Sequence, residues 1–182
     1  MFKLIEKNST LILVLALIVG LFLLLYPAAA NYWNKLHQTE ALNNYTYFAA
    51  ELTSEENQEI IRQAVEYNSH INERDNIFIL SEEEKARYEE TLDVSGTGIM
   101  GYIDIPVIKV TLPIYHTTKD TVLQIGVGHV EWSALPVGGE GTHAILSGHR
   151  GLPSAKLFSD LDKVNEGDTF KITILDTVLT YE

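Results

Sequence analysis

The pattern of hydrophobic and polar positions first separates an N-terminal apolar segment from the rest of the chain. Leu11–Tyr26 is an unbroken run of apolar residues, and its extension to Ala30 reaches the ~20 residues that a helix needs to cross a bilayer. Lys3 and Lys7 precede the run, whereas the next lysine is Lys35. Because positive charge is retained on the cytoplasmic side, this asymmetry predicts a cytoplasmic stub and an external location for everything after residue 30.

Two interpretations of this segment remain open. It is either a retained transmembrane anchor or the apolar region of a signal peptide that is cleaved after the small residues Ala28, Ala29 and Ala30. The run is long for a signal peptide, which favours the anchor. Both interpretations place the remainder of the chain outside the membrane.

Residues 31–95 show a helical spacing of apolar positions. Asn31–Glu51 predicts a helix that continues away from the bilayer, and Thr53 or Ser54 offers a cap for a second helix that ends near Tyr67. The apolar positions that give this second helix one hydrophobic side are Ile60, Ile61, Ala64 and Val65.

A third helix is predicted after a loop over residues 72–80. Ser81, followed three residues later by Glu84, is a capping-box pattern, so the helix should run from Glu82 to about Leu92. The apolar stripe is too short for a coiled coil. We therefore expect these amphipathic helices to pack on the outside of the domain that follows.

From Gly96 onward, the pattern changes to short β-branched and aromatic stretches separated by proline and glycine. The expected strands are Ile99–Ile105, Lys109–Tyr115, Val127–Glu131, Thr142–Ser147, Thr169–Leu175 and Val178–Tyr181. No helix of crossover length separates them, which argues against a parallel α/β sheet. The pattern predicts a mainly β domain, an antiparallel barrel over residues 96–182, in which Pro113 marks an edge or a bulge.

Composition excludes several kinds of site. The formal net charge is −12, and no basic stripe offsets it, so nucleic acid is not an expected partner. The chain contains no cysteine, which excludes a disulfide, a thiolate metal site and a cysteine nucleophile from these 182 residues. A cationic protein partner remains compatible with this charge, although solubility alone accounts for it.

One histidine stands where a strand is expected to end. Thr142–Leu146 is predicted as a strand that runs into Ser147 and Gly148, where the chain must turn, so His149 can face a cleft. A histidine in that place can act as an acid or a base near neutral pH. On position alone, a solvated loop histidine is the more frequent outcome.

His143 and His129 are the competing candidates. On an extended strand, His143 and His149 share one face but lie about 20 Å apart, too far to bind one metal. His129 can approach His143 from a neighbouring strand, although a structural hydrogen bond is the expected use of both. Ser147 lacks the Gly-x-Ser-x-Gly context of a nucleophile, and no phosphate, dinucleotide or zinc signature occurs, so no cofactor or metal is expected.

Two stretches resemble one known family. LPVGGEGTHAILSGHRGLPSAKLFSDLDKVNEGDTFKI and the preceding DVSGTGIMGYIDIPVIKVTLPIYH are similar to the central segment of class C sortases. The resemblance extends from about Asp93 to the end. It implies an anchor in residues 1–30, a helical prelude in residues 31–95 and a sortase β-barrel in residues 96–182, outside the membrane of a Gram-positive bacterium.

The resemblance also implies an activity. Class C sortases are transpeptidases that build pili: a cysteine cleaves an LPxTG-like sorting signal between Thr and Gly, and a lysine of the next pilin resolves the thioacyl-enzyme as an isopeptide. The histidine of the Ser-Gly-His motif, here His149, is the general acid and base of the family. The implied partners are pilin subunits with a sorting signal and an acceptor lysine.

The chain departs from the family pattern in its catalytic partners. The family's cysteine in a TLxTC-type strand, and its arginine on the next strand, are expected downstream of Glu182, where the barrel looks unfinished; the second membrane segment is absent as well. Arg150 belongs to the His-Arg-Gly motif and does not replace that arginine. These 182 residues alone are expected to be inactive, and the alternative is a tethered, non-catalytic binder of sorting signals or a decayed gene product.

A further departure concerns the lid. Many class C enzymes carry an Asp-Pro-aromatic segment before the barrel, whereas this chain offers only the distant counterpart Asp75-Asn-Ile-Phe78. The sequence therefore leaves open whether a lid regulates the site.

Overall fold

The computed structural model describes residues 2–71 and 76–182, with side chains from Ser9 onward. The helices are α1 (Phe2–Glu51), α2 (Ser54–Ser69), α3 (Glu82–Glu90) and α4 (Asp120–Leu123), with short 3-10 turns at Pro106–Ile108 and Leu161–Lys163. The strands are β1 (Ile99–Ile105), β2 (Val110–His116), β3 (Val127–His129), β4 (Leu146–Ser147), β5 (Phe170–Ile174) and β6 (Thr177–Tyr181).

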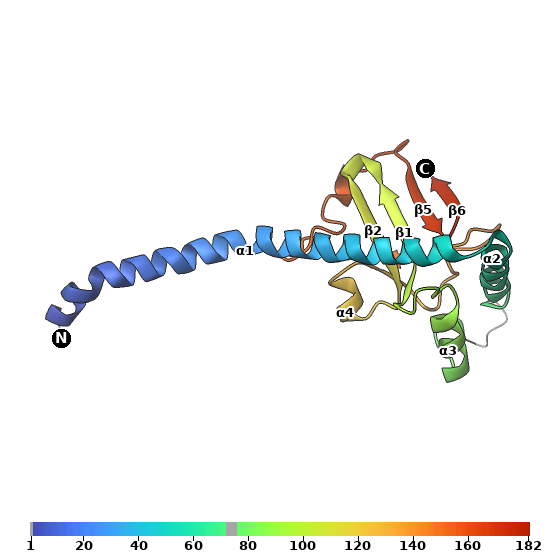
Figure 1. Ribbon diagram of the computed structural model, residues 1–182, viewed down its shortest axis with the longest axis horizontal. Coiled ribbons are helices and arrows are strands. Elements are labelled where there is room, and N and C mark those ends of the chain that lie inside the picture. The colour runs from blue at the N-terminus through green and yellow to red at the C-terminus, as the bar shows by residue number, and fades with distance from the viewer. Residues whose placement is uncertain (1, 72–75) are drawn as a thin grey trace.

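The strands form one sheet in the order β4-β3-β2-β1-β5-β6 (Figure 1), which confirms a mainly β fold. The sheet is not closed, because β4 and β6 are its two edges. Neighbouring strands are antiparallel except β2 and β3, which run parallel. The sequence did not predict this parallel pair. It arises because the connection from His116 to Val127, which includes α4, carries the chain across before β3 begins.

Two expectations about individual strands need correction. Only Leu146–Ser147 of the expected strand 142–147 pairs as a strand. The turn-forming Gly139 and Gly141, both with positive φ, lie directly before this segment and delay the strand. Pro113 lies in the interior strand β2, but β3 begins opposite Ile114, so the proline sits just past the end of its neighbour.

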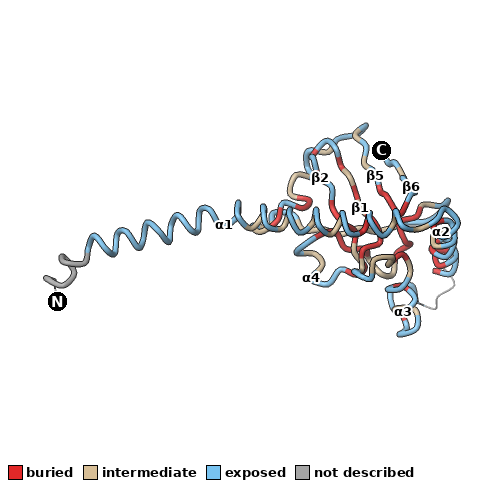
Figure 2. Tube along the Cα trace, viewed as in Figure 1, coloured by how far each residue is buried: buried red, intermediate tan, exposed pale blue. Residues whose placement is uncertain are grey.

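Helix α1 joins the apolar segment to the sheet without interruption. Its N-terminal half projects from the molecule and is exposed from Ser9 onward, whereas its C-terminal half lies across β1 and β2 (Figures 1 and 2). The apolar half passes the length and hydropathy test for a membrane span, a test that a signal sequence also passes. The contacting face follows a heptad-like spacing: Asn31, Asn34, Gln38, Ala41, Tyr45 and Ala49.

Tyr45 fixes this helix to the sheet. Its hydroxyl donates to the carbonyl oxygen of Met100 at 3.1 Å and accepts the amide N–H of Leu175 at 2.8 Å, so it joins β1 to the end of β5. Burial raises the pKa of Tyr45 to about 12, which keeps the hydroxyl protonated and able to donate.

Helices α2 and α3 flank the sheet as amphipathic elements. Both begin with capping boxes, Thr53 with Glu56 and Ser81 with Glu84; the second was predicted. The amide of the buried Asn68 on α2 pairs with both backbone groups of Leu135, at 3.0 and 2.7 Å. These two hydrogen bonds attach α2 to the segment before β4 in the way that a neighbouring strand bonds a backbone. The hydrophobic pattern of the sequence gives no sign of this contact.

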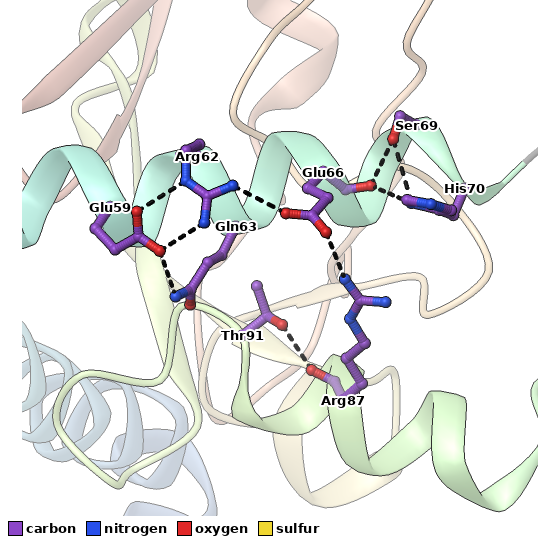
Figure 3. Close-up of polar contacts among 8 residues, drawn as sticks. All are labelled: Glu59, Arg62, Gln63, Glu66, Ser69, His70, Arg87 and Thr91. Atoms are coloured by element: carbon purple, nitrogen blue, oxygen red, sulfur yellow. Dashed lines mark hydrogen bonds and ion pairs between the residues drawn. The ribbon is translucent and has the colours of Figure 1, made fainter.

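The outer sides of the two helices carry an ion-pair network (Figure 3). Arg62 bonds Glu59 and Glu66 within α2, and Arg87 of α3 lies 3.9 Å from Glu66. Hydrogen bonds from Arg62 and then Gln63 lower the pKa of Glu59 to about 2. Because these side chains are exposed, solvent screens the network and it adds little to stability.

Two side chains, Tyr88 of α3 and His129 of β3, form a buried polar pair. The hydroxyl of Tyr88 lies 3.0 Å from Nδ1 of His129 and accepts the amide N–H of Thr117 at 3.0 Å. Nε2 of His129 donates to the carbonyl oxygen of Ala134 at 2.8 Å. Burial lowers the pKa of His129 to about 4, which keeps the ring neutral.

We expect Tyr45→Phe to lower the free energy of unfolding by about 1–3 kcal/mol, because Met100 and Leu175 each lose a buried hydrogen-bond partner. Urea denaturation of the full chain in detergent measures the change. The matched control is Tyr47→Phe on the exposed side of the same helix, which should leave stability unchanged. Equal effects of the two substitutions would contradict this role of Tyr45.

We also expect acid to destabilise the fold through His129. The folded-state pKa of His129 is about 4 and the unfolded value is near 6.5, so this stability is complete above pH 6.5 and is lost as the pH falls toward 4. Between pH 7.5 and 5.5, the loss from this group is about 1 kcal/mol. Denaturation at both pH values measures it, and His129→Gln should flatten the difference, whereas His143→Gln should not.

Candidate active site

His149 follows directly on the edge strand β4. Ser147 pairs with Gly128 and Leu146 with His129, so β3 fixes the strand as far as Ser147. The chain then leaves the sheet at Gly148, and the side chain of His149 is half-buried. The position at a strand end therefore agrees with the sequence prediction, although the strand is shorter.

Gly148 is required by close packing rather than by its backbone conformation. A Cβ atom at this position would lie 2.7 Å from Cδ2 of Phe158, closer than real side chains approach. The amide N–H of Phe158 in turn donates to the carbonyl oxygen of His149 at 3.1 Å. One aromatic residue therefore supports the backbone on both sides of the turn that presents His149.

The remainder of the loop is held by polar contacts. Gly151 adopts a positive φ of 73°, and its N–H donates to Oγ of Ser159 at 3.0 Å. Arg150 points to Asp162, with 3.2 Å between the charged groups. The guanidinium is thus engaged with the segment after the loop, and both partners are largely exposed.

The carboxylate of Asp160 forms ion pairs with two lysines beside this loop. Asp160 contacts Lys156 at 2.5 Å and Lys163 at 2.8 Å. Hydrogen bonds from Lys156 and then Lys163 lower the pKa of the Asp160 carboxyl, which stays ionised at neutral pH. These two ion pairs hold the start and the end of the segment of residues 156–163 close together.

The histidines of the domain fall into two groups. Both ring nitrogens of the buried His116 face carbonyl oxygens, those of Gly98 at 3.0 Å and Thr91 at 2.9 Å. The buried His129 is likewise occupied by structural hydrogen bonds, as predicted. The rings of His143 and His149, by contrast, have no hydrogen-bond partner within the described part of the chain, so the structural hydrogen bond predicted for His143 is not formed. His143 is exposed, whereas His149 is half-buried.

An apolar hollow of about 470 Å³ lies next to the His149 loop. The inner sheet face and the residues after β4 form its walls: Ile103, Ile105, Leu146, Phe158, Phe170 and Ile172 among others. Phe158 therefore supports the turn at Gly148 and lines the hollow as well. His143 also lines it, while His149 does not.

A second hollow of about 470 Å³ lies between α2 and the loop before β4. Trp132, Ile77 and His143 line it, and Phe78 packs edge-on against Trp132 with ring centroids 5.0 Å apart. Phe78 belongs to the segment weighed as a distant lid counterpart. Asp75 of that segment lies outside the described residues.

The arrangement offers a proton-transfer group beside an apolar hollow. Among residues 9–71 and 76–182, no cluster of three His, Asp or Glu side chains is placed to hold a metal. The chain supplies no thiol, because it contains no cysteine. His143 and His149 are not brought together, so the two histidines do not act as a pair.

Sequence reasoning missed the residues that position the site. Phe158 was recognised only as part of the family-like stretch, and Asn68, Tyr45 and Ser133 were not singled out. The Oγ atom of Ser133 accepts the N–H of Ile145 at 3.0 Å and so secures the approach to β4. Their partners lie far away in sequence, and a single polar residue at helical spacing gives little warning of such a contact.

Comparisons with known proteins agree with this geometry. A family model described as a sortase domain matches residues 103–182. No curated protein matches the chain. Among solved structures, sortase C1 of Streptococcus agalactiae superposes with a TM-score of 0.75 at 43% identity, over 79% of this chain and 74% of that one.

Two further structures extend the likeness. Sortase C of Streptococcus pneumoniae is 35% identical, with a TM-score of 0.68 over 79% of this chain and 72% of that one. A lid mutant of sortase A from Corynebacterium diphtheriae is 34% identical, with a TM-score of 0.65 over 71% and 70% of the two chains. Because the likeness covers most of each chain at these identities, the protein belongs to the sortase family, and within it to class C.

Proposed function

We propose that the protein is the His-bearing part of a pilin-polymerising transpeptidase, with His149 as its general acid and base. The observation that carries the proposal is the unengaged, half-buried ring of His149 at the end of β4, within a sortase fold. The published description of the pneumococcal relative concerns catalysis and pilin substrate specificity. By that likeness, the substrates are pilin subunits with LPxTG-like sorting signals.

The chemistry assigns His149 two proton transfers. A cysteine thiolate attacks the carbonyl carbon between Thr and Gly, and the imidazolium of His149 gives its proton to the departing glycine amine. The thioester that forms keeps the acyl group reactive. A lysine amine of the next pilin then attacks, His149 takes the proton from that amine, and the thiolate leaves as the isopeptide bond forms.

The reacting cysteine and the substrate-orienting arginine are not among these 182 residues. We place them on strands that complete the sheet beyond β6, where they would face the apolar hollow beside Phe158. Without them the polypeptide has acid–base capacity but no nucleophile, so we expect it to be inactive alone. Arg150, paired with Asp162, is not the substitute.

We further propose that residues 1–30 anchor the protein in the membrane of a Gram-positive cell, with the domain outside. The support is the exposed apolar half of α1 and the lysines that precede it. A cleaved signal peptide would leave the same domain outside but free of the membrane. Membrane fractionation of the expressed protein separates the two outcomes.

A non-catalytic sorting-signal binder is the second candidate, and the absence of cysteine favours it. Both candidates predict that the 182-residue chain forms no product from an LPxTG peptide and an amine. They differ in the gene: an open frame past codon 182 that encodes a Thr-Cys strand and an arginine strand supports the enzyme, whereas a stop codon there supports the binder.

We expect His149→Ala to lower kcat/KM for ligation of an LPxTG peptide to an amine by about 10²–10⁴-fold, because both proton transfers lose their catalyst. The measurement uses a version extended by the cysteine and arginine strands, with thermal unfolding as the test of folding. His143→Ala is the matched control, since His143 lines the hollow without being assigned a role. A fully active His149→Ala enzyme would overturn the assignment.

We expect Gly148→Ala to impair the same ligation by displacing His149, because the added methyl group would overlap the ring of Phe158. The overlap should also cost about 1–3 kcal/mol of stability. Combining Gly148→Ala with Phe158→Leu relieves the overlap, so the double variant should be more active than Gly148→Ala alone. No difference between the two variants would show that this contact does not position the turn.

A further inference from the structure

The loop after His149 is bonded to α1 at the point where the apolar run ends. The amide N–H of Lys156 donates to Oδ1 of Asn31 at 2.8 Å, and Nδ2 of Asn34 donates to the carbonyl oxygen of Ser154 at 2.8 Å. Asn31 follows directly on Ala30, the last residue of the apolar segment. Figure 1 shows the orange loop beside α1 where the helix reaches the body of the molecule.

The rise per residue of a helix gives the distance of this contact from the hydrocarbon core of the bilayer. At 1.5 Å per residue, the roughly 20 residues from Leu11 to Ala30 span about 30 Å, which matches the hydrocarbon core of a bilayer. Asn31 and Asn34 then lie within about 6 Å of the hydrocarbon boundary, and the headgroup layer is about 5–8 Å thick. A segment that is hydrogen-bonded to these two asparagines lies at the same distance from the hydrocarbon boundary, on whichever side of the helix it packs.

Side chains on α1 support the same boundary. Tyr32 and Trp33 are 65% and 64% exposed directly after the apolar run, where aromatic residues with a polar atom favour the headgroup region. Lys35 is exposed one residue after Asn34. An exposed cation at this level is attracted to anionic headgroups, while the acidic remainder of the chain is repelled by them.

Two further contacts along α1 show that other parts of the domain lie farther from the bilayer. Gln38 donates to the carbonyl oxygen of Ile125 at 2.8 Å, one helical turn beyond Asn34. Tyr45 bonds Leu175, the residue before Asp176 in the β5–β6 turn, at 2.8 Å. Tyr45 lies about 22 Å past Ala30 along the helix, well beyond the headgroup layer.

We propose that α1 holds the loop of residues 150–156, and with it the neighbouring His149, in the headgroup layer of a phospholipid bilayer, through the hydrogen bonds of Asn31 and Asn34. The inference rests on the membrane span of the proposed function. A polypeptide that reaches His149 must then enter within one or two helical turns of the bilayer surface. This position selects chains tethered to the same membrane over chains that arrive from solution.

The absence of native cysteine makes the test direct, because each engineered cysteine carries the only label. Lys156→Cys and Asp176→Cys, each spin-labelled, are reconstituted as the full chain into vesicles of phosphatidylcholine and phosphatidylglycerol. A nickel chelate attached to lipid headgroups relaxes only labels close to the surface. We expect strong relaxation at position 156 and little at position 176, a position tied to α1 through Tyr45 in the same way.

A helix extension provides the matched control. Inserting seven helix-forming residues between Ala30 and Asn31 raises the domain by about 10 Å and preserves its orientation around the helix, because seven residues make about two turns. The relaxation at position 156 should then fall to the level seen at position 176. Replacing both asparagines, Asn31→Ala with Asn34→Ala, should weaken the relaxation at position 156 by releasing the loop.

Flotation of the same vesicles separates the two proposals. A chain that does not float with the vesicles lacks the membrane span. In that case both the anchor in residues 1–30 and the headgroup position of the loop are wrong. A chain that floats but gives equal relaxation at positions 156 and 176, or no response to the insertion, retains its span and overturns the headgroup position of the loop.

Discussion

The attachment of α1 to the sheet is the contact on which the other features depend. Polar side chains set the position of the helix on the domain: Asn31 and Asn34 bond backbone groups of the loop after His149, Gln38 bonds that of Ile125, and Tyr45 bonds those of Met100 and Leu175. An apolar helix face would tolerate sliding along its axis, whereas hydrogen bonds to fixed backbone atoms define one position. The same helix begins as the exposed apolar segment, so the domain is held in a defined relation to whatever surrounds that segment.

Burial separates the histidines with structural hydrogen bonds, His116 and His129, from His143 and His149, whose rings are not enclosed in the core. His129 and His116 lie among backbone carbonyl groups and the hydroxyl of Tyr88, and their rings complete the interior. A ring that is enclosed in the core and hydrogen-bonded there cannot exchange protons with a substrate. His149 is half-buried at a strand end, on a turn that Phe158 supports from below, and its ring remains open. Position in the fold, and not residue type, therefore distinguishes the candidate acid–base group.

The open sheet leaves an apolar hollow next to the loop that carries His149. Between β1, β5 and the residues after β4, the inner face of the sheet lines an apolar hollow, and Phe158 lies in its wall. Under the proposed function, the hollow and His149 serve the same reaction.

Much of the fold and part of the site were predictable from sequence, because they depend on local patterns. The apolar run, the capping box at Ser81 and the strand Ile99–Ile105 were expected and are present. So was the placement of His149 after a strand, and the family resemblance is confirmed by the structural relatives. The assignment of His149 as the catalytic residue stays a prediction.

Other features were decided only by the tertiary structure. The pairing of Asn68 with Leu135 joins residues 67 positions apart, and the parallel alignment of β2 with β3 depends on how a connection crosses the sheet. The shortening of β4 and the attachment of the His149 loop to α1 depend likewise on distant partners. Sequence by itself determined which segments are apolar, capped or β-forming, and that no thiol is present. The folded chain decided which polar groups meet, because hydrogen bonds between distant segments leave no periodic pattern along the chain.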